Sequence, residues 1–204
     1  MRVFLIHGMG RSRASMAALG LRLRAAGHAP SNFGYQVMGT PLDRIARDFV
    51  AHVRRVQAAQ AGGSAAGYAV VGHSLGNIIT RMVVAELPPG FERFVMLAPP
   101  NRSPALARAS RKSRIYRSLT GEAGKLLGDR EFYAQLPIPE LPTLILAGGS
   151  NPAWLPHNDP ESDGIVSIEE TRLAGAEHRV VDATHTFIMN HPEAVRQVLA
   201  FLER

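Results

Sequence analysis

The segment Gly72-His73-Ser74-Leu75-Gly76 has the residue types of a turn that presents a nucleophilic serine. The five letters alone are a weak signal, but they lie between an apolar run that predicts a strand and a segment of helical period. A sharp turn at such a place lifts a serine Oγ above a sheet, and the N–H of Leu75 then points to where an oxyanion would form. Because the chain has no cysteine, any nucleophile is an oxygen or a nitrogen. Ser74 is therefore the candidate nucleophile.

A serine of ordinary acidity needs a base within about 3 Å, and that base needs a third group to orient it. The chain has eight histidines. His7 and His73 lie inside turn motifs, where we expect local hydrogen bonds. His185 follows the last expected strand, at the same sheet edge as the serine turn, so we take it as the base.

The third group should be a carboxylate placed between the strand expected at 143–147 and this histidine. Three residues satisfy that condition: Asp159, Glu161 and Asp163.

The same loop also has nearly the spacing of an EF-hand calcium site. Asp159, Glu161 and Asp163 alternate with other residues, and Glu170 falls where the last ligand belongs. However, no helix is expected to enter this loop, Pro160 lies inside it, and the sequence contains no second copy to pair with it. We therefore expect no metal and no cofactor.

Short apolar runs alternate with longer segments of helical period, which predicts a parallel sheet covered by helices on both faces. Strands are expected at residues 3–6, 32–37, 68–71, 94–98, 143–147 and 179–182. Helices are expected at 12–26, from an N-cap at Thr40 to about residue 60, at 77–87, and from Pro192 to the last residues. Residues 62–67 are expected to form a flexible connector.

Residues 99–141 interrupt this alternation and are too short to bury a core of their own. We therefore expect one domain, residues 1–204, with a cap-like insertion at 99–141. The net charge is +6, and residues 99–121 contain six basic residues and no acidic one. The rest of the chain has 17 basic and 17 acidic residues, a balance that argues against a nucleic-acid partner. The six basic residues are Arg102, Arg108, Arg111, Lys112, Arg114 and Arg117.

Two interpretations of this basic segment remain open. The arginines could attract an anionic group of a substrate, or they could form the solvated surface of a helical excursion. On a helical wheel, the basic residues from Arg108 to Arg117 spread around almost every face, unlike the one-sided pattern of a helix that lies on a membrane. The sequence has no run of about 18 apolar residues, so integral membrane association is not expected. The start of the chain does not have the pattern of a secretory signal, and we expect a cytoplasmic protein.

Taken together, these motifs resemble those of the α/β-hydrolases, and within them the small bacterial lipases and serine esterases. The resemblance covers nearly the whole chain. It rests on His7-Gly8-Met9-Gly10 after the first strand, the Gly-His-Ser-Leu-Gly turn, Ser162-Asp163-Gly164-Ile165-Val166, and the late His185. It implies that Asp163 completes a triad with Ser74 and His185, and that the N–H of Met9 joins that of Leu75 in an oxyanion hole.

The resemblance also implies a minimal α/β-hydrolase fold, with a roughly six-stranded, mostly parallel sheet, helices on both faces and a short cap. The sequence provides no segment for the two N-terminal antiparallel strands of the full fold. The implied activity is hydrolysis of a small-molecule carboxylic ester through an acyl-enzyme. Thioesterase or acyltransferase chemistry would use the same triad. A non-catalytic interaction protein on the same scaffold is the alternative from another functional class.

Overall fold

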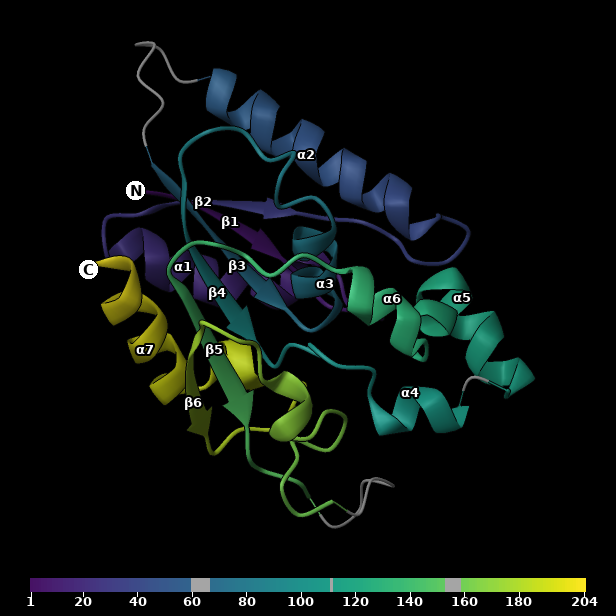
Figure 1. Cartoon of the computed structure of the whole chain (residues 1–204). Coiled ribbons are helices and arrows are strands. Elements are labelled where there is room, and N and C mark those ends of the chain that lie inside the picture. Colours follow the sequence, from purple (N-terminus) through teal and green to yellow (C-terminus); the bar gives the residue numbers. More distant parts are fainter. Residues whose placement is uncertain (60–66, 111, 153–158) are drawn as a thin grey trace.

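Six parallel strands form one sheet in a computed structural model that describes residues 1–59, 67–110, 112–152 and 159–204 (Figure 1). The strand order is β2-β1-β3-β4-β5-β6, so the chain first builds toward one edge of the sheet and then toward the other. This order confirms the six-stranded parallel sheet expected from the sequence. Residues 62–66 of the expected connector and Arg111 lie outside the described residues. The strands are β1 (Arg2–Ile6), β2 (Ala29–Phe33), β3 (Tyr68–His73), β4 (Phe91–Leu97), β5 (Thr143–Gly148) and β6 (Glu177–Val181).

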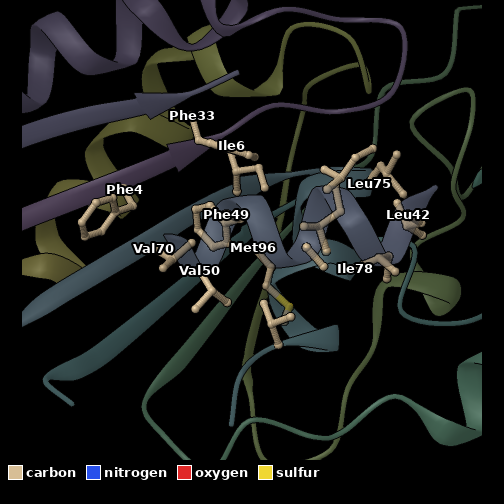
Figure 2. Packing of buried hydrophobic residues seen from close by; sticks show 14 of the residues in the cluster. Phe4, Ile6, Phe33, Leu42, Phe49, Val50, Val70, Leu75, Ile78 and Met96 are labelled. Atoms are coloured by element: carbon tan, nitrogen blue, oxygen red, sulfur yellow. The ribbon is translucent and has the colours of Figure 1, made fainter. Parts of the chain in front are cut away.

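Helices cover both faces of the sheet. Alternate residues of each strand point to opposite faces, so Phe4 and Ile6 of β1 join one core while Val3 and Leu5 join the other. Figure 2 shows the first core, in which side chains of the sheet pack against those of two helices. The helices on that side are α2 (Leu42–Ala58) and α3 (Leu75–Met82), and those on the other side are α1 (Ala17–Ala25) and α7 (Pro192–Leu202).

The insertion between β4 and β5 folds as short helices that lie beside the sheet (Figure 1). Its backbone bends sharply at Gly121, where φ is 59° and ψ is −143°. Since Arg108 belongs to one helix, Arg114 and Arg117 to the next, and Lys112 to neither, the single helical wheel assumed from the sequence does not apply. Buried residues of the insertion, Ala107 and Leu127 among them, join the core on the α2 and α3 side. The helices are α4 (Ala105–Ser110), α5 (Arg114–Leu127) and α6 (Arg130–Gln135).

Two local predictions were wrong. The strand expected at 32–37 is β2, which ends at Phe33 and is an edge strand that pairs only with β1 among the described residues. Its polar sequence hides it, because an edge strand buries few side chains. Thr40 does not cap α2; its N-cap is Pro41, and the N–H of Leu42 donates to Glu122 Oε2 of α5 at 2.8 Å.

The expected helix 77–87 is α3, which begins two residues earlier, at Leu75, and ends five residues earlier, at Met82. Single-turn 3₁₀ helices occur at Arg13–Met16, Glu169–Thr171 and Ile188–Asn190. No helix among the described residues is long and apolar enough to cross a lipid bilayer.

Candidate active site

Ser74 stands in a strained turn between β3 and α3. Its φ of 49° and ψ of −120° lie in a region that residues with a side chain rarely occupy. The surrounding hydrogen bonds hold this conformation: the Ser74 N–H donates to Leu97 O at 2.9 Å, and Asn77 Nδ2 donates to Ser74 O and to Leu97 O, each at 3.1 Å. The buried Asn77 side chain therefore ties the serine turn to the end of β4.

Glycine is required on both sides of this serine. A Cβ at Gly72 would lie 2.2 Å from Asn77 Oδ1, and a Cβ at Gly76 would lie 2.6 Å from Ile6 O. A Cβ at Gly8 would lie 2.9 Å from Ser74 Cβ. The two motifs predicted from the sequence are thus in direct contact, and both need glycine because their backbones approach so closely.

A continuous hydrogen-bond chain joins the three residues expected to form the triad. His185 Nε2 lies 2.9 Å from Ser74 Oγ, and His185 Nδ1 lies 2.7 Å from Asp163 Oδ2. A carboxylate can only accept a hydrogen bond, so Nδ1 carries the proton and the Nε2 lone pair faces the serine hydroxyl. The Asp163 side chain is completely buried and His185 is 6% exposed, which keeps water away from this contact.

The conformation of Asp163 is fixed by a tight turn. Its Oδ1 accepts hydrogen bonds from the N–H groups of Ile165 and Val166 at 3.0 and 2.8 Å, which leaves Oδ2 free for the histidine. The His185 N–H donates to Asp163 O at 3.0 Å, so the two residues are also joined through the backbone. Of the other carboxylates, Glu161 is exposed, and Asp159 Oδ1 accepts from the Glu161 N–H.

The calcium alternative finds no support in this loop. Glu170, the would-be last ligand, accepts a hydrogen bond from the Ala105 N–H at 2.7 Å and one from the Ser167 N–H at 3.0 Å. The Asp163 carboxylate is occupied by backbone N–H groups and by the histidine. Within the described ranges, no three histidine or acidic side chains gather as a metal site would require.

Of the two residues expected to form the oxyanion hole, Leu75 directly follows the serine and Met9 adjoins the glycine that contacts it. Leu75 is the first residue of α3, and the N–H groups of a first helical turn have no acceptor within the helix. Met9 follows Gly8, whose backbone packs against Ser74. The N-terminal end of α3 also carries a partial positive charge, which favours an anion at this position.

His73 has a role that the sequence analysis missed. We expected it to bond locally, but its Nε2 donates to the backbone oxygen of His185 at 2.9 Å, and the two rings lie 5.1 Å apart. Burial lowers the pKa of His73 well below its usual value, so this imidazole is neutral. Position 73 at the end of a buried strand is the signal that could have indicated a long-range contact. His7 bonds its neighbour Gly8 O at 2.9 Å, as expected, but its Nε2 also accepts the distant Tyr35 N–H at 3.3 Å.

An apolar hollow adjoins the histidine. The cavity has a volume of about 170 Å³, and Ile165 and Phe187 belong to its wall together with Asp163 and His185. The Phe187 side chain is 65% exposed, which is unusual for a large apolar residue. The surface next to the hydrogen-bond chain is therefore apolar.

No protein-family model and no curated protein matches this sequence, whereas solved structures do. A lipase of Bacillus licheniformis, BlEst2 in its mature form, has a TM-score of 0.74 at 15% identity, over 97% of this chain and 91% of the lipase. The phospholipase PlaB of Legionella pneumophila has a TM-score of 0.76 at 16% identity, and this chain spans 59% of its length while matching over all of its own. The esterase Pf2001 of Pyrococcus furiosus has a TM-score of 0.68 at 19% identity, over all of this chain and 82% of the esterase. Their shared architecture and the parallel sheet described above show that this chain has the α/β-hydrolase fold, in a six-stranded form with a helical insertion after β4.

Proposed function

We propose that this chain is a serine hydrolase that cleaves carboxylic esters through an acyl-enzyme. The observation that carries the proposal is the pair of hydrogen bonds that runs from Ser74 Oγ through the His185 ring to Asp163. A serine at a strained strand-to-helix turn, with a base 2.9 Å away and a buried acid behind it, has what an activated nucleophile needs. The similar solved structures are a lipase, a phospholipase and an esterase, which favours an ester as the substrate.

In the acylation step, Ser74 Oγ attacks the ester carbonyl carbon while its proton passes to His185 Nε2. The imidazolium that forms is stabilised by the Asp163 carboxylate at Nδ1. The carbonyl oxygen becomes an oxyanion, which the N–H groups of Leu75 and Met9 stabilise; loss of one such donor typically costs about 3 kcal/mol of transition-state stabilisation. As the carbon–oxygen bond to the alcohol breaks, His185 gives its proton to the departing oxygen.

Water completes the cycle. A water molecule takes the place of the alcohol, His185 removes a proton from it, and the resulting hydroxide attacks the acyl carbon. The bond to Ser74 Oγ breaks, the serine recovers its proton from His185, and a carboxylic acid leaves. The apolar wall formed by Ile165 and Phe187 lies beside His185 and favours substrates with an apolar part that reaches this side of the histidine.

The proposal is tested with a fluorophosphonate probe, which loses fluoride when a serine Oγ attacks its phosphorus. We expect labelling of the wild type, no labelling of Ser74→Ala, and normal labelling of Ser118→Ala, a control at an exposed serine of α5. The same three proteins are assayed with 4-nitrophenyl butyrate. Labelling of Ser74→Ala at the wild-type rate, or a wild type that neither reacts with the probe nor hydrolyses the ester, would contradict the proposal.

A further inference from the structure

The loop after β2 contacts the segment that carries Met9, one of the two residues proposed for the oxyanion hole. Tyr35 lies in this loop, two residues beyond the end of β2, and its ring stacks on that of His7 with the centroids 4.2 Å apart and the planes 5° apart. Because β1 and β2 are parallel neighbours, the segments that follow them lie at the same edge of the sheet. The sequence predicted a strand at this position, and the structure instead places Tyr35 against the loop that follows β1.

Two hydrogen bonds also join Tyr35 to His7. Tyr35 Oη donates to His7 O at 2.7 Å, and the Tyr35 backbone N–H donates to His7 Nε2 at 3.3 Å. Burial raises the pKa of the Tyr35 phenol, so the hydroxyl keeps its proton and can donate. Burial also lowers the pKa of the His7 imidazole, so this ring is uncharged at neutral pH. Tyr35 therefore holds both the ring and the backbone of His7.

The tautomer of His7 follows from these contacts. Because Nε2 accepts the Tyr35 N–H, it carries no proton, and the proton of the neutral ring lies on Nδ1. His7 Nδ1 then donates to Gly8 O at 2.9 Å. Gly8 O also accepts the Arg11 N–H at 3.3 Å, across a tight turn. Two donors therefore fix the direction of the Gly8 carbonyl.

The Gly8 carbonyl and the Met9 N–H belong to one peptide group. This peptide is trans and planar, so its N–H points opposite to its C=O, and a fixed carbonyl also fixes the N–H. The Met9 N–H donates to no acceptor among the described residues. The Gly8 backbone lies against the serine, since a Cβ on Gly8 would be 2.9 Å from Ser74 Cβ. A free N–H of fixed direction close to the nucleophile is what an oxyanion hole requires.

We infer that Tyr35 is a positioning residue for the oxyanion hole, acting through His7 on the Met9 N–H. The inference rests on the proposed function, because it assigns Tyr35 to the transition state of ester hydrolysis. The Tyr35 hydroxyl fixes the peptide between His7 and Gly8, and the His7 ring, held by Tyr35, fixes the next peptide. Without the hydroxyl, His7 O loses its donor, and the Met9 N–H is held less firmly where the oxyanion forms. The loss falls on the transition state, because the charge on the carbonyl oxygen develops only there.

The test compares Tyr35→Phe with Tyr68→Phe. The first variant removes only the hydroxyl and keeps the ring that stacks on His7. The second is a matched control, because Tyr68 Oη also donates to a backbone oxygen in a half-buried contact, that of Pro88 at 2.8 Å. Tyr68 begins β3, about 20 Å along the strand from Ser74, so its hydroxyl is remote from the site. Since both variants lose one hydrogen bond of the same kind, we expect a similar decrease in Tm.

Two quantities report on the oxyanion hole: the kinetics on 4-nitrophenyl butyrate, and the inhibition constant of phenylboronic acid, which forms a tetrahedral, negatively charged adduct with a serine Oγ. In Tyr35→Phe, kcat and kcat/KM should fall about tenfold with KM unchanged, and the inhibition constant should rise by a similar factor. This loss is smaller than the roughly 10²- to 10³-fold loss caused by removal of an oxyanion donor itself. Tyr68→Phe should keep the wild-type kinetics and inhibition constant.

A merely structural role of Tyr35 gives a different pattern. In that case Tm falls in Tyr35→Phe while kcat and the inhibition constant stay at their wild-type values, and the inference is overturned. Equal losses of kcat in the two variants, or a rise in KM alone, would overturn it as well. A wild type that neither hydrolyses the ester nor reacts with the fluorophosphonate probe would refute the proposed function and the inference with it. An active wild type with an equally active Tyr35→Phe would refute the inference alone.

Discussion

Replacement of Asp163 by asparagine is expected to turn His185 into the wrong tautomer. Asp163 Oδ1 accepts hydrogen bonds from two backbone N–H groups, at 3.0 and 2.8 Å, so the amide oxygen of asparagine must take this position. The amide nitrogen then occupies the position of Oδ2, 2.7 Å from His185 Nδ1. Since this nitrogen is a donor, Nδ1 must become the acceptor, and the ring proton moves to Nε2.

The wrong tautomer of His185 leaves Ser74 without a base. With a proton on Nε2, His185 donates to Ser74 Oγ instead of accepting its proton, so the base is lost while the packing is unchanged. In serine hydrolases such a change lowers kcat about 10⁴-fold, which corresponds to about 5.5 kcal/mol of activation free energy. Because asparagine and aspartate have nearly the same volume, the free energy of unfolding should change much less than that.

The assay is kcat on 4-nitrophenyl butyrate together with thermal unfolding of each variant. Glu161→Gln is the matched control, because Glu161 belongs to the same loop, is exposed and was a candidate for the same role from the sequence. It should retain wild-type activity. If Asp163→Asn keeps more than about a tenth of the wild-type kcat, or if Glu161→Gln is the variant that fails, the assignment of the acid is refuted.

Three further predictions follow from the geometry. Ser74→Ala and His185→Ala should each abolish ester hydrolysis, and the double variant should be no worse than either alone; additive losses would contradict a joint role. Burial lowers the pKa of His73, so at acidic pH the unfolded chain binds a proton there that the folded chain does not. The free energy of unfolding should therefore decrease as the pH is lowered from about 6.5. In urea unfolding, His73→Gln should reduce this slope by about 1.4 kcal/mol per pH unit, and an unchanged slope would assign the effect to other groups. Gly76→Ala should destabilise by about 1–3 kcal/mol because its Cβ would meet Ile6 O, whereas Gly20→Ala in α1 has room and should not destabilise.

The strands and the serine turn could be predicted because their signals are local. Each buried strand is a short apolar run, and a strand followed by glycine, serine and a helix already fixes the geometry of the turn. The segments that follow β1 and β3 approach each other closely because Gly8 and Gly76 have no side chain. Both glycines can be read from the sequence. The α/β-hydrolase fold could therefore be predicted from the hydrophobic pattern and the resemblance of the motifs alone.

The acid could not be chosen from the residues by themselves. Asp159, Glu161 and Asp163 follow the same strand, and only the hairpin in which Ser162 pairs with Ser167 turns one of them toward the histidine. The cap of α2 was missed for a similar reason, because its acceptor, Glu122, comes from the insertion 80 residues later. Contacts of this kind depend on how distant segments pack, so the periodicity of a single segment does not predict them.

Helix α3 joins the serine turn to the insertion. Its residues from Leu75 to Arg81 are all buried, so it has no solvent face for an amphipathic pattern to reveal. The polar side chains it buries are bound by backbone oxygens: Asn77 by those of Ser74 and Leu97, Thr80 by that of Gly76, and Arg81 by those of the insertion at 136 and 137. These bonds satisfy the buried donor groups of the three side chains, although Asn77 Oδ1 has no partner among the described residues, and they fix the helix at both ends. The N-terminal end of α3 therefore carries the serine turn, and its last turn binds the insertion through Arg81.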